Sequence, residues 1–176
     1  MKALALFALL LAGLPARACL VKEILKPQLL VEQAQAIYHV RAGGYVVPLR
    51  QLPHGQTPKV NFILLGVIKG AASKEPLQFA GVLVQRDDRN DQTAPYDFVR
   101  PAGRRGMCFA TEYRAGAEYL MLIKGGTPYW AHLSPTNEQV FGPSDAWLKW
   151  VKQQAAQSSK VRPNNFIQPK PLRGSA

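Results

Sequence analysis

The sequence predicts a mainly β fold: a small closed barrel of five strands, followed by one amphipathic helix. Runs rich in β-branched and aromatic residues recur through most of the chain, and turn residues separate them. Glycines stand inside or between these runs, where the strands of a small barrel have to bend. Apolar residues at the helical spacing of three and four appear near the carboxyl end.

The first half of the domain contains three of the predicted strands. In chain order we expect a short helix or turn over 28–35 and strands over 36–42, 60–68 and 77–85. Alternation in the first strand places Ala36, Tyr38, Val40 and Ala42 on one face, and Ile37, His39 and Arg41 on the other. Glycines indicate a bulge at Gly43-Gly44, a turn at Lys69-Gly70 and a bend at Gly81.

The second half is expected to supply two more strands and the helix. A polar loop over 86–105 precedes a turn at Gly116-Ala117, and strands follow over 118–123 and 129–133. The polar run 135–139 is expected to be a turn whose side chains bond to the backbone.

The helix is expected to begin at Ser144, which can cap its first N–H groups, with Asp145 at the positive end of its dipole. Its apolar face consists of Trp147, Trp150, Val151 and Ala155. We expect this face to pack against the barrel rather than to form a ligand-binding tryptophan box.

Residues 1–18 have the pattern of a secretory signal peptide. Lys2 is followed by an apolar run, and Ala16-Arg17-Ala18 is a small-x-small cleavage site. About 12 apolar residues span only ~18 Å as a helix, against ~30 Å of bilayer core, so no membrane span is expected. Cleavage would leave 158 residues (176 − 18), the size of one domain, exported to the periplasm or secreted.

Export bears on the two cysteines, Cys19 and Cys108. In an oxidising compartment they have one intramolecular pairing, which would close a loop of ~90 residues and stabilise the fold by up to ~4–5 kcal/mol. The alternatives are an acylated Cys19 and two free thiols. Ala16 and Arg17 stand where lipid attachment sites usually carry leucine and a small residue, so the disulfide is favoured.

The mature chain is strongly basic. Without Lys2 and Arg17 it has 20 basic residues (22 − 2) against 11 acidic ones, a net charge of +9 (20 − 11). After a domain spanning 19–157, residues 158–176 contain three prolines and few large apolar residues, and we expect a flexible, disordered tail there. This tail is the candidate contact for anionic partners: lipopolysaccharide, acidic glycans, extracellular nucleic acid or lipid headgroups. Its basic side chains are Lys160, Arg162, Lys170 and Arg173.

The residues do not indicate a catalytic set, a metal site or a cofactor motif. His39, His54 and His132 lack metal-ligand spacing, and no nucleophile elbow or phosphate-binding loop occurs in the sequence. One loop holds four aspartates without the order of a calcium loop: Asp87, Asp88, Asp91 and Asp97. We expect these to be solvated and paired with nearby arginines, and we expect no enzyme and no cofactor.

Four pieces of the chain share the pattern of a known family. They are Cys19 at the mature terminus, A-I-Y-x-V-x-A at 36–42, V-x-F-x-L-L-x-V-x-K-G at 60–70, and Cys108 followed by G-x-E-Y-L at 116–120. Together they resemble the netrin-like modules, which include the amino-terminal domain of tissue inhibitors of metalloproteinases and their bacterial relatives. The resemblance covers roughly 19–133 and implies a five-stranded OB-type barrel with flanking helices.

The same resemblance implies a candidate protease contact at Cys19 and Leu20. Inhibitors of the family chelate a protease zinc with the free amine and carbonyl of their first residue, which a Cys-x-Cys start holds rigid. Val21 stands here in place of the second cysteine, so potent general inhibition is not expected. An OB-type face would offer Tyr45, Lys59, Lys69 and Lys124 to a nucleic acid.

The function expected from these observations is an exported, non-enzymatic binding module of the envelope or the extracellular space. Its partner is expected to be a protein, with a protease as one candidate. Polyanion binding through the basic tail is the alternative, and an enzyme without a recognisable site is the least favoured interpretation.

Overall fold

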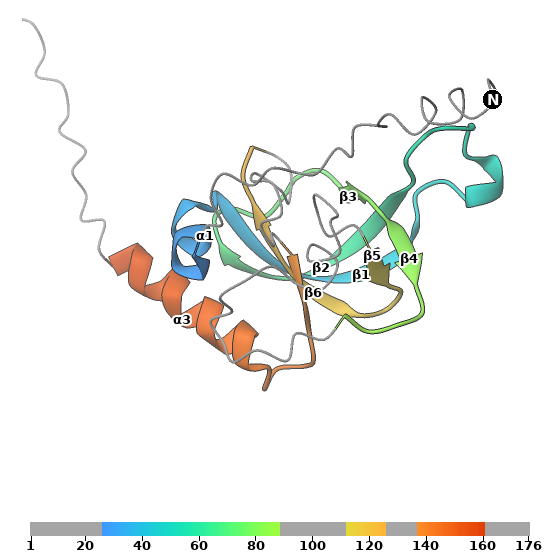
Figure 1. The fold of residues 1–176 in the computed structure, drawn as a ribbon. Helices are drawn as coiled ribbons and strands as arrows, with labels where there is room; N and C mark the ends of the chain where they lie inside the picture. Colours follow the sequence, from blue (N-terminus) through green and yellow to red (C-terminus); the bar gives the residue numbers. More distant parts are fainter. Residues whose placement is uncertain (1–25, 89–111, 126–136, 161–176) are drawn as a thin grey trace, which may run out of the picture.

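The computed structural model describes residues 26–88, 112–125 and 137–160. The elements in these ranges are α1 Pro27–Gln33, β1 Ala36–Tyr45, η1 Leu49–Gln51, β2 Lys59–Lys69, β3 Leu77–Ala80, β4 Val82–Val84, β5 Glu112–Arg114, β6 Glu118–Ile123, β7 Asn137–Val140 and α3 Ala146–Lys160. Figure 1 shows α1 and α3 side by side against one end of the sheet. The prediction of a mainly β fold with a carboxyl-terminal helix is confirmed.

The strands form one large and one small sheet. The large sheet is antiparallel with the order β3-β2-β1-β6-β7, so β1 lies at its centre between β2 and β6. The small sheet is the parallel pair β4 and β5. Among the described residues no pairing joins β3 to β7, so these pairings do not close the ring that the sequence predicted. The chain instead leaves the large sheet at Gly81, where the expected third strand divides into β3 and β4.

β1 has the two faces that its alternation predicted, and a separate core packs on each. Ile37 is buried towards the helices, while Tyr38, Val40 and Ala42 are buried on the opposite face. The predicted bulge is also present, because the register between β1 and β2 shifts between Ala42 and Tyr45.

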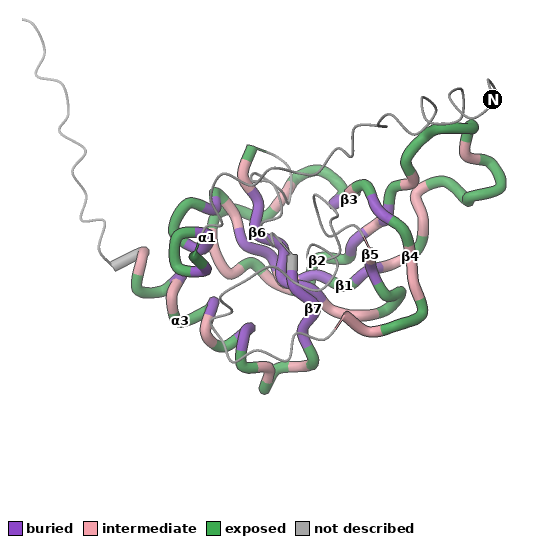
Figure 2. The backbone as a smooth tube through the Cα atoms, in the orientation of Figure 1, coloured by how far each residue is buried: buried purple, intermediate pink, exposed green. Residues whose placement is uncertain are grey.

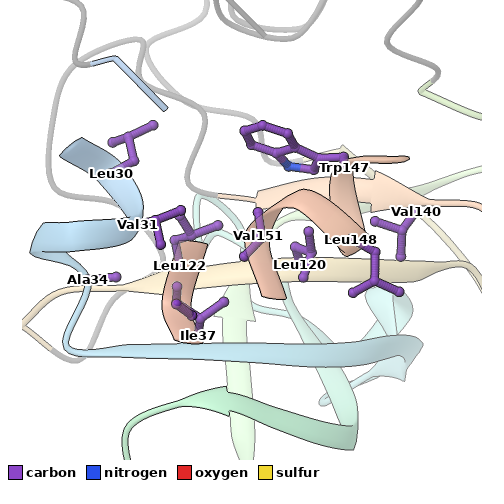
Figure 3. Close-up of a cluster of buried hydrophobic side chains, with 11 residues drawn as sticks. Leu30, Val31, Ala34, Ile37, Leu120, Leu122, Val140, Trp147, Leu148 and Val151 are labelled. Atoms are coloured by element: carbon purple, nitrogen blue, oxygen red, sulfur yellow. The ribbon is translucent and has the colours of Figure 1, made fainter. Parts of the chain in front are cut away.

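The first core lies between the two helices and the large sheet. Figure 3 shows the helical side chains above those of the central strands. Its buried members are Leu30, Val31, Ala34, Ile37, Leu120, Leu122, Val140, Trp147, Leu148, Val151 and Ala155. Burial of this apolar face stabilises α1, which has only seven residues and would be marginal alone.

The second core is rich in aromatic side chains and lies on the opposite face. Phe62 and Tyr113 meet edge to face with ring centroids 4.9 Å apart, and Tyr113 meets Tyr119 in the same way at 5.3 Å. Side chains from β1, β2, β3, β5 and β6 contribute to this core, and Figure 2 shows the buried segments concentrated in the central strands. Such edge-to-face contacts add to the burial of apolar area.

The helix α3 differs from expectation at both ends. Asp145, not Ser144, caps it: its Oδ1 accepts from the Leu148 N–H at 3.0 Å and its Oδ2 from the Phe141 N–H at 3.1 Å. A carboxylate has two accepting oxygens, so Asp145 can end β7 and begin α3 together. The helix continues through Lys160 and therefore takes the first three residues of the segment that was expected to be tail.

The apolar face of α3 packs as predicted, with one addition. Trp147, Val151 and Ala155 are buried, Trp150 is partly buried and stacks on Trp147 with ring centroids 5.0 Å apart, and Leu148 joins them. The predicted packing of this face against the sheet is therefore confirmed.

The polar run that was expected to be a turn contributes a strand instead. Asn137–Val140 forms β7 and pairs with β6 from Met121 to Glu118. Gln139 does bond to the backbone, as expected of this run, because its Oε1 accepts from the Asp88 N–H at 2.8 Å. The strand predicted over 129–133 lies outside the described residues.

Candidate functional site

The large sheet is uncovered on part of its outer face, the face that carries the helices. There the pairing of β1 places Arg41 opposite Ile63 of β2 and Glu118 of β6, and His39 opposite Gly66. Directly opposite residues share a face of a sheet. We call these five residues, His39, Arg41, Ile63, Gly66 and Glu118, the open face. Arg41 and Ile63 are exposed and the other three are half-buried.

Glu118 connects the polar members of the open face. Its Oε1 accepts from Arg41 Nη2 at 2.8 Å, and its Oε2 lies 2.8 Å from His39 Nε2. Because an ionised carboxylate can only accept, Nε2 of His39 carries the proton in this contact. Glu118 of β6 lies 77 residues after Arg41 and 79 residues after His39, both of which belong to β1.

The electrostatics of this group favour an ionised Glu118. The hydrogen bond from Arg41 lowers the pKa of the Glu118 carboxyl below its ordinary value, and His39 acts in the same direction. Partial burial opposes both, but it is the smaller effect beside the bond from Arg41. A carboxylate engaged at both oxygens is poorly placed to act as a general base, so the group is suited to recognition more than to proton transfer.

Next to this polar group β2 exposes apolar side chains. Ile63, Leu64, Leu65 and Val67 are all exposed, and they follow one another within a single strand. Ile63 lies opposite Arg41 on the outer face, whereas Leu64 and Val67 lie opposite Val40 and Tyr38 on the inner face. Several large apolar side chains exposed close together can mark a binding surface. The open face and this stretch of β2 together form the candidate site.

A second polar cluster ties the small sheet to β7. Asp87 Oδ1 accepts from Arg114 Nη1 at 2.8 Å and from Gln139 Nε2 at 2.6 Å. Asp87 is thus paired internally, as expected for the aspartate loop, although its arginine comes from β5 rather than from the loop. Asp91 and Asp97 lie outside the described residues. Within those residues, no group of three or more His, Cys, Asp or Glu could hold a metal ion.

Most site residues predicted from the sequence lie outside the described ranges. These are Cys19, Leu20, Cys108, Arg162, Lys170 and Arg173, so the disulfide, the protease contact and most of the basic tail stay predictions. Lys160 is the last residue of α3. His54 is exposed in the connection between β1 and β2, and His132 is outside the described residues.

Two of the three lysines proposed for a nucleic-acid face contact α1. Lys69 Nζ donates to two carbonyl oxygens of α1, and Lys124 Nζ donates to Oε1 of Gln33 at the end of that helix. Tyr45 lies at the other end of β1, where its hydroxyl accepts from the Leu83 N–H. The four residues therefore do not line one common surface.

Glu118 was not singled out from the sequence, although a signal for it exists. Once strands 36–42 and 118–123 are both recognised, antiparallel pairing can bring an acid at the start of one beside His39 and Arg41 of the other. What the sequence lacks is the pairing itself, because nothing local identifies β6 rather than another strand as the neighbour of β1.

Comparison of the chain with protein-family models, with curated proteins and with solved structures found no significant match. In the part of the chain that the structure describes, none of the helices is both long and apolar enough to cross a membrane. Function is therefore inferred from the site itself.

Proposed function

We propose that the protein is an exported, non-enzymatic binding module whose partner is another protein. The observation that carries this proposal is the exposed apolar stretch of β2 beside the group formed by Arg41, His39 and Glu118. The centres of protein interfaces are apolar and enriched in arginine, and their rims are polar. The candidate site has both parts next to each other on a rigid sheet.

The fold that we propose for this module is an OB-type barrel of the netrin-like kind. In support, β1 pairs on both sides, β4 follows β3 after Gly81, and β5 turns into β6 within four residues. The pair β4–β5 thus links the β3 side of the large sheet to β6. The aromatic core is lined from five strands, which is what an enclosed barrel interior requires.

Export and the terminal disulfide belong to the same proposal. Cleavage after Ala18 would expose the amine of Cys19, and a bond to Cys108 would fix that terminus to the domain. A protease-directed version would act through Cys19 and Leu20. Binding of polyanions is the second candidate function, and the charge of +9 expected for the mature chain favours it. It would use the basic segment that begins at Lys160.

Photo-crosslinking from the candidate site tests the protein-binding function. A photoreactive amino acid replaces Ile63 in the full chain, which is expressed in a cell that exports it, and a matched protein carries the probe at exposed Leu49 of η1. We expect discrete protein adducts from position 63 and not from position 49. Adducts at neither position, or adducts to lipopolysaccharide alone, would contradict the proposal and favour the polyanion alternative.

A further inference from the structure

We propose that β2 is a strand-addition site. The edge of residues 63–68, along which no described strand pairs on the β3 side, binds an extended segment of a partner protein that is apolar at its centre and acidic at its ends. The inference rests on the proposed protein-binding function and assigns it a surface, a binding mode and a partner chemistry.

One edge of β2 pairs with β1 along most of its length, but the described part of the sheet covers only the beginning of the other edge. On one side β1 pairs with β2 from Val60 to Lys69. On the other side β3 pairs with it from Lys59 to Phe62 and no further. Across the described residues no strand continues along that second side. Alternate residues of a strand point their N–H and C=O groups to the same edge, so the stretch 63–68 offers unpaired donors and acceptors to an added strand.

The side chains of the same stretch are apolar and exposed. Relative exposure is 57% for Ile63, 36% for Leu64, 39% for Leu65 and 41% for Val67. Ile63 lies opposite Arg41 on the outer face, whereas Leu64 and Val67 lie opposite Val40 and Tyr38 on the inner face. An added strand with alternating side chains would therefore find apolar contacts on both faces.

β2 lacks two of the usual protections of an edge strand along this stretch. Natural edges carry inward-pointing charges, prolines, bulges or very short strands to prevent pairing with another chain. The register of β1 and β2 shifts near Leu65 and again near Ile68, which bends the strand. However, no charged residue and no proline occurs between Lys59 and Lys69. An edge of this kind is suited to pairing with another chain.

The occupant of this edge could be a second copy of this chain or a segment of another protein, and charge distinguishes the two. Both charged residues of β2 are lysines, and the mature chain is expected to carry +9, so two copies of it repel each other. A segment with acidic ends is attracted by the same charge. The positive charge therefore favours a partner with acidic flanks over a second copy of this chain.

The test uses the full mature chain and a defined peptide. The probe is a capped ten-residue peptide of three alternating valine-threonine pairs with two glutamates at each end, and its binding is measured by fluorescence anisotropy. Two further peptides carry N-methyl groups on the valines or on the threonines, which removes the backbone donors of one edge or the other. A fourth peptide has lysine in place of glutamate.

We expect the acidic peptide to bind, and at least one N-methylated peptide and the lysine peptide to bind at least tenfold more weakly. Ile63→Glu should weaken binding of the acidic peptide at least tenfold. Leu49→Glu adds the same charge at a residue that is 53% exposed, and it should change binding less than twofold. Amide hydrogen exchange over 63–68 should slow when the peptide is added.

Four results would overturn the inference. Absence of binding at about 1 mM peptide would contradict strand addition, because recognition weaker than this carries little free energy. If both N-methylated peptides bind as tightly as the unmethylated acidic peptide, the contact is made by side chains without strand pairing. Full protection of the 63–68 amides in the free chain shows that the chain already covers its own edge. A dimer that Ile63→Glu abolishes identifies a second copy as the occupant. If strand addition fails while crosslinking from position 63 still succeeds, the protein-binding function stands without it.

Discussion

The ammonium group of Lys69 caps the end of α1 by donating to the carbonyl oxygen of Val31 at 2.8 Å. The same group donates to the carbonyl of Glu32 at 2.7 Å. Carbonyls in the last turn of a helix lack an intrahelical partner, and a positive charge there also complements the helix dipole. α1 has no basic residue in its own last turn. The cap is therefore supplied by a strand that lies 38 residues further along the chain.

Lys69→Met should destabilise the domain by about 1–3 kcal/mol, because two hydrogen bonds from a charged donor are lost while the aliphatic stem is kept. Urea denaturation monitored by circular dichroism measures the change. Lys59→Met, at the exposed opposite end of β2, is the matched control and should cost less than about 0.5 kcal/mol. Equal effects of the two variants would show that the cap adds nothing.

Gly70→Ala should destabilise the domain by about 2–4 kcal/mol, because the backbone conformation and the space are both unsuitable for a side chain. Gly70 has φ of +81°, and a Cβ there would lie 2.6 Å from the carbonyl oxygen of Gln35. Gly55 has the same φ but nothing within 4 Å, so Gly55→Ala should cost only about 1–2 kcal/mol. Thermal unfolding of both variants gives the difference that is due to the close contact.

Glu118→Gln should reduce stability at neutral pH and make little difference in acid. The pKa of Glu118 is lowered in the folded state, mainly by the bond from Arg41. Its contribution is therefore fully present above the unfolded-state pKa of about 4.3 and is lost as the pH falls through the lower folded value. Urea midpoints of the parent and of Glu118→Gln should converge as the pH falls below about 4.3.

Carbon-detected NMR titration of the Glu118 carboxyl provides the direct check. Arg41→Met should raise the pKa of this group towards its ordinary value, since the first cause of its depression is removed. A pKa that stays unchanged in Arg41→Met would assign the effect to His39 instead.

Mature protein should have a mass two hydrogens below that of the reduced chain starting at Cys19, with no acyl group. Intact-mass spectrometry before and after reduction tests this. Cys108→Ala should then destabilise the domain by ~2–5 kcal/mol, as is typical for a native disulfide of an exported domain. A diacylglyceryl mass, or two alkylatable thiols in native protein, would contradict the expected bond.

Deletion of residues 161–176 should weaken polyanion binding without changing the melting temperature. The deletion begins at 161 because α3 continues through Lys160. The deletion removes Arg162, Lys170 and Arg173, which takes the expected mature charge from +9 to +6 (9 − 3). Retention on heparin should fall most clearly below ~0.1 M salt. Unchanged retention would exclude the segment as the contact, and a lower melting temperature would show that it packs on the domain.

Local pattern was sufficient for most of the fold. The alternation of β1, the bulge at Gly43-Gly44, the bend at Gly81 and the apolar face of α3 all follow from short-range physical rules, and the structure contains each of them. The errors came from residues that local rules allow in two roles. Asn137–Val140 carries turn-forming side chains, yet pairing with β6 makes it a strand. Ser144 and Asp145 are both good caps, and the position of Phe141 favours Asp145.

The candidate site was harder to predict than the fold, for a different reason. Its polar group joins residues that lie 77 and 79 positions apart, and its apolar part is notable only because β3 ends beside Phe62. Ile63 is exposed because this part of the outer face is not covered, and no residue next to Ile63 in the sequence determines that. Strand pairing over long separations is not encoded in any local window.

The bridge from Glu118 to His39 and Arg41 also bears on how the two central strands align as the domain folds. A one-residue slip of β1 against β6 would turn His39 and Arg41 into the aromatic core and Tyr38 and Val40 towards the open face. A guanidinium without a carboxylate in that interior would cost several kcal/mol. The shared carboxylate therefore stabilises one alignment, the aromatic core disfavours the neighbouring ones, and a single acid at the start of β6 helps to select the correct pairing.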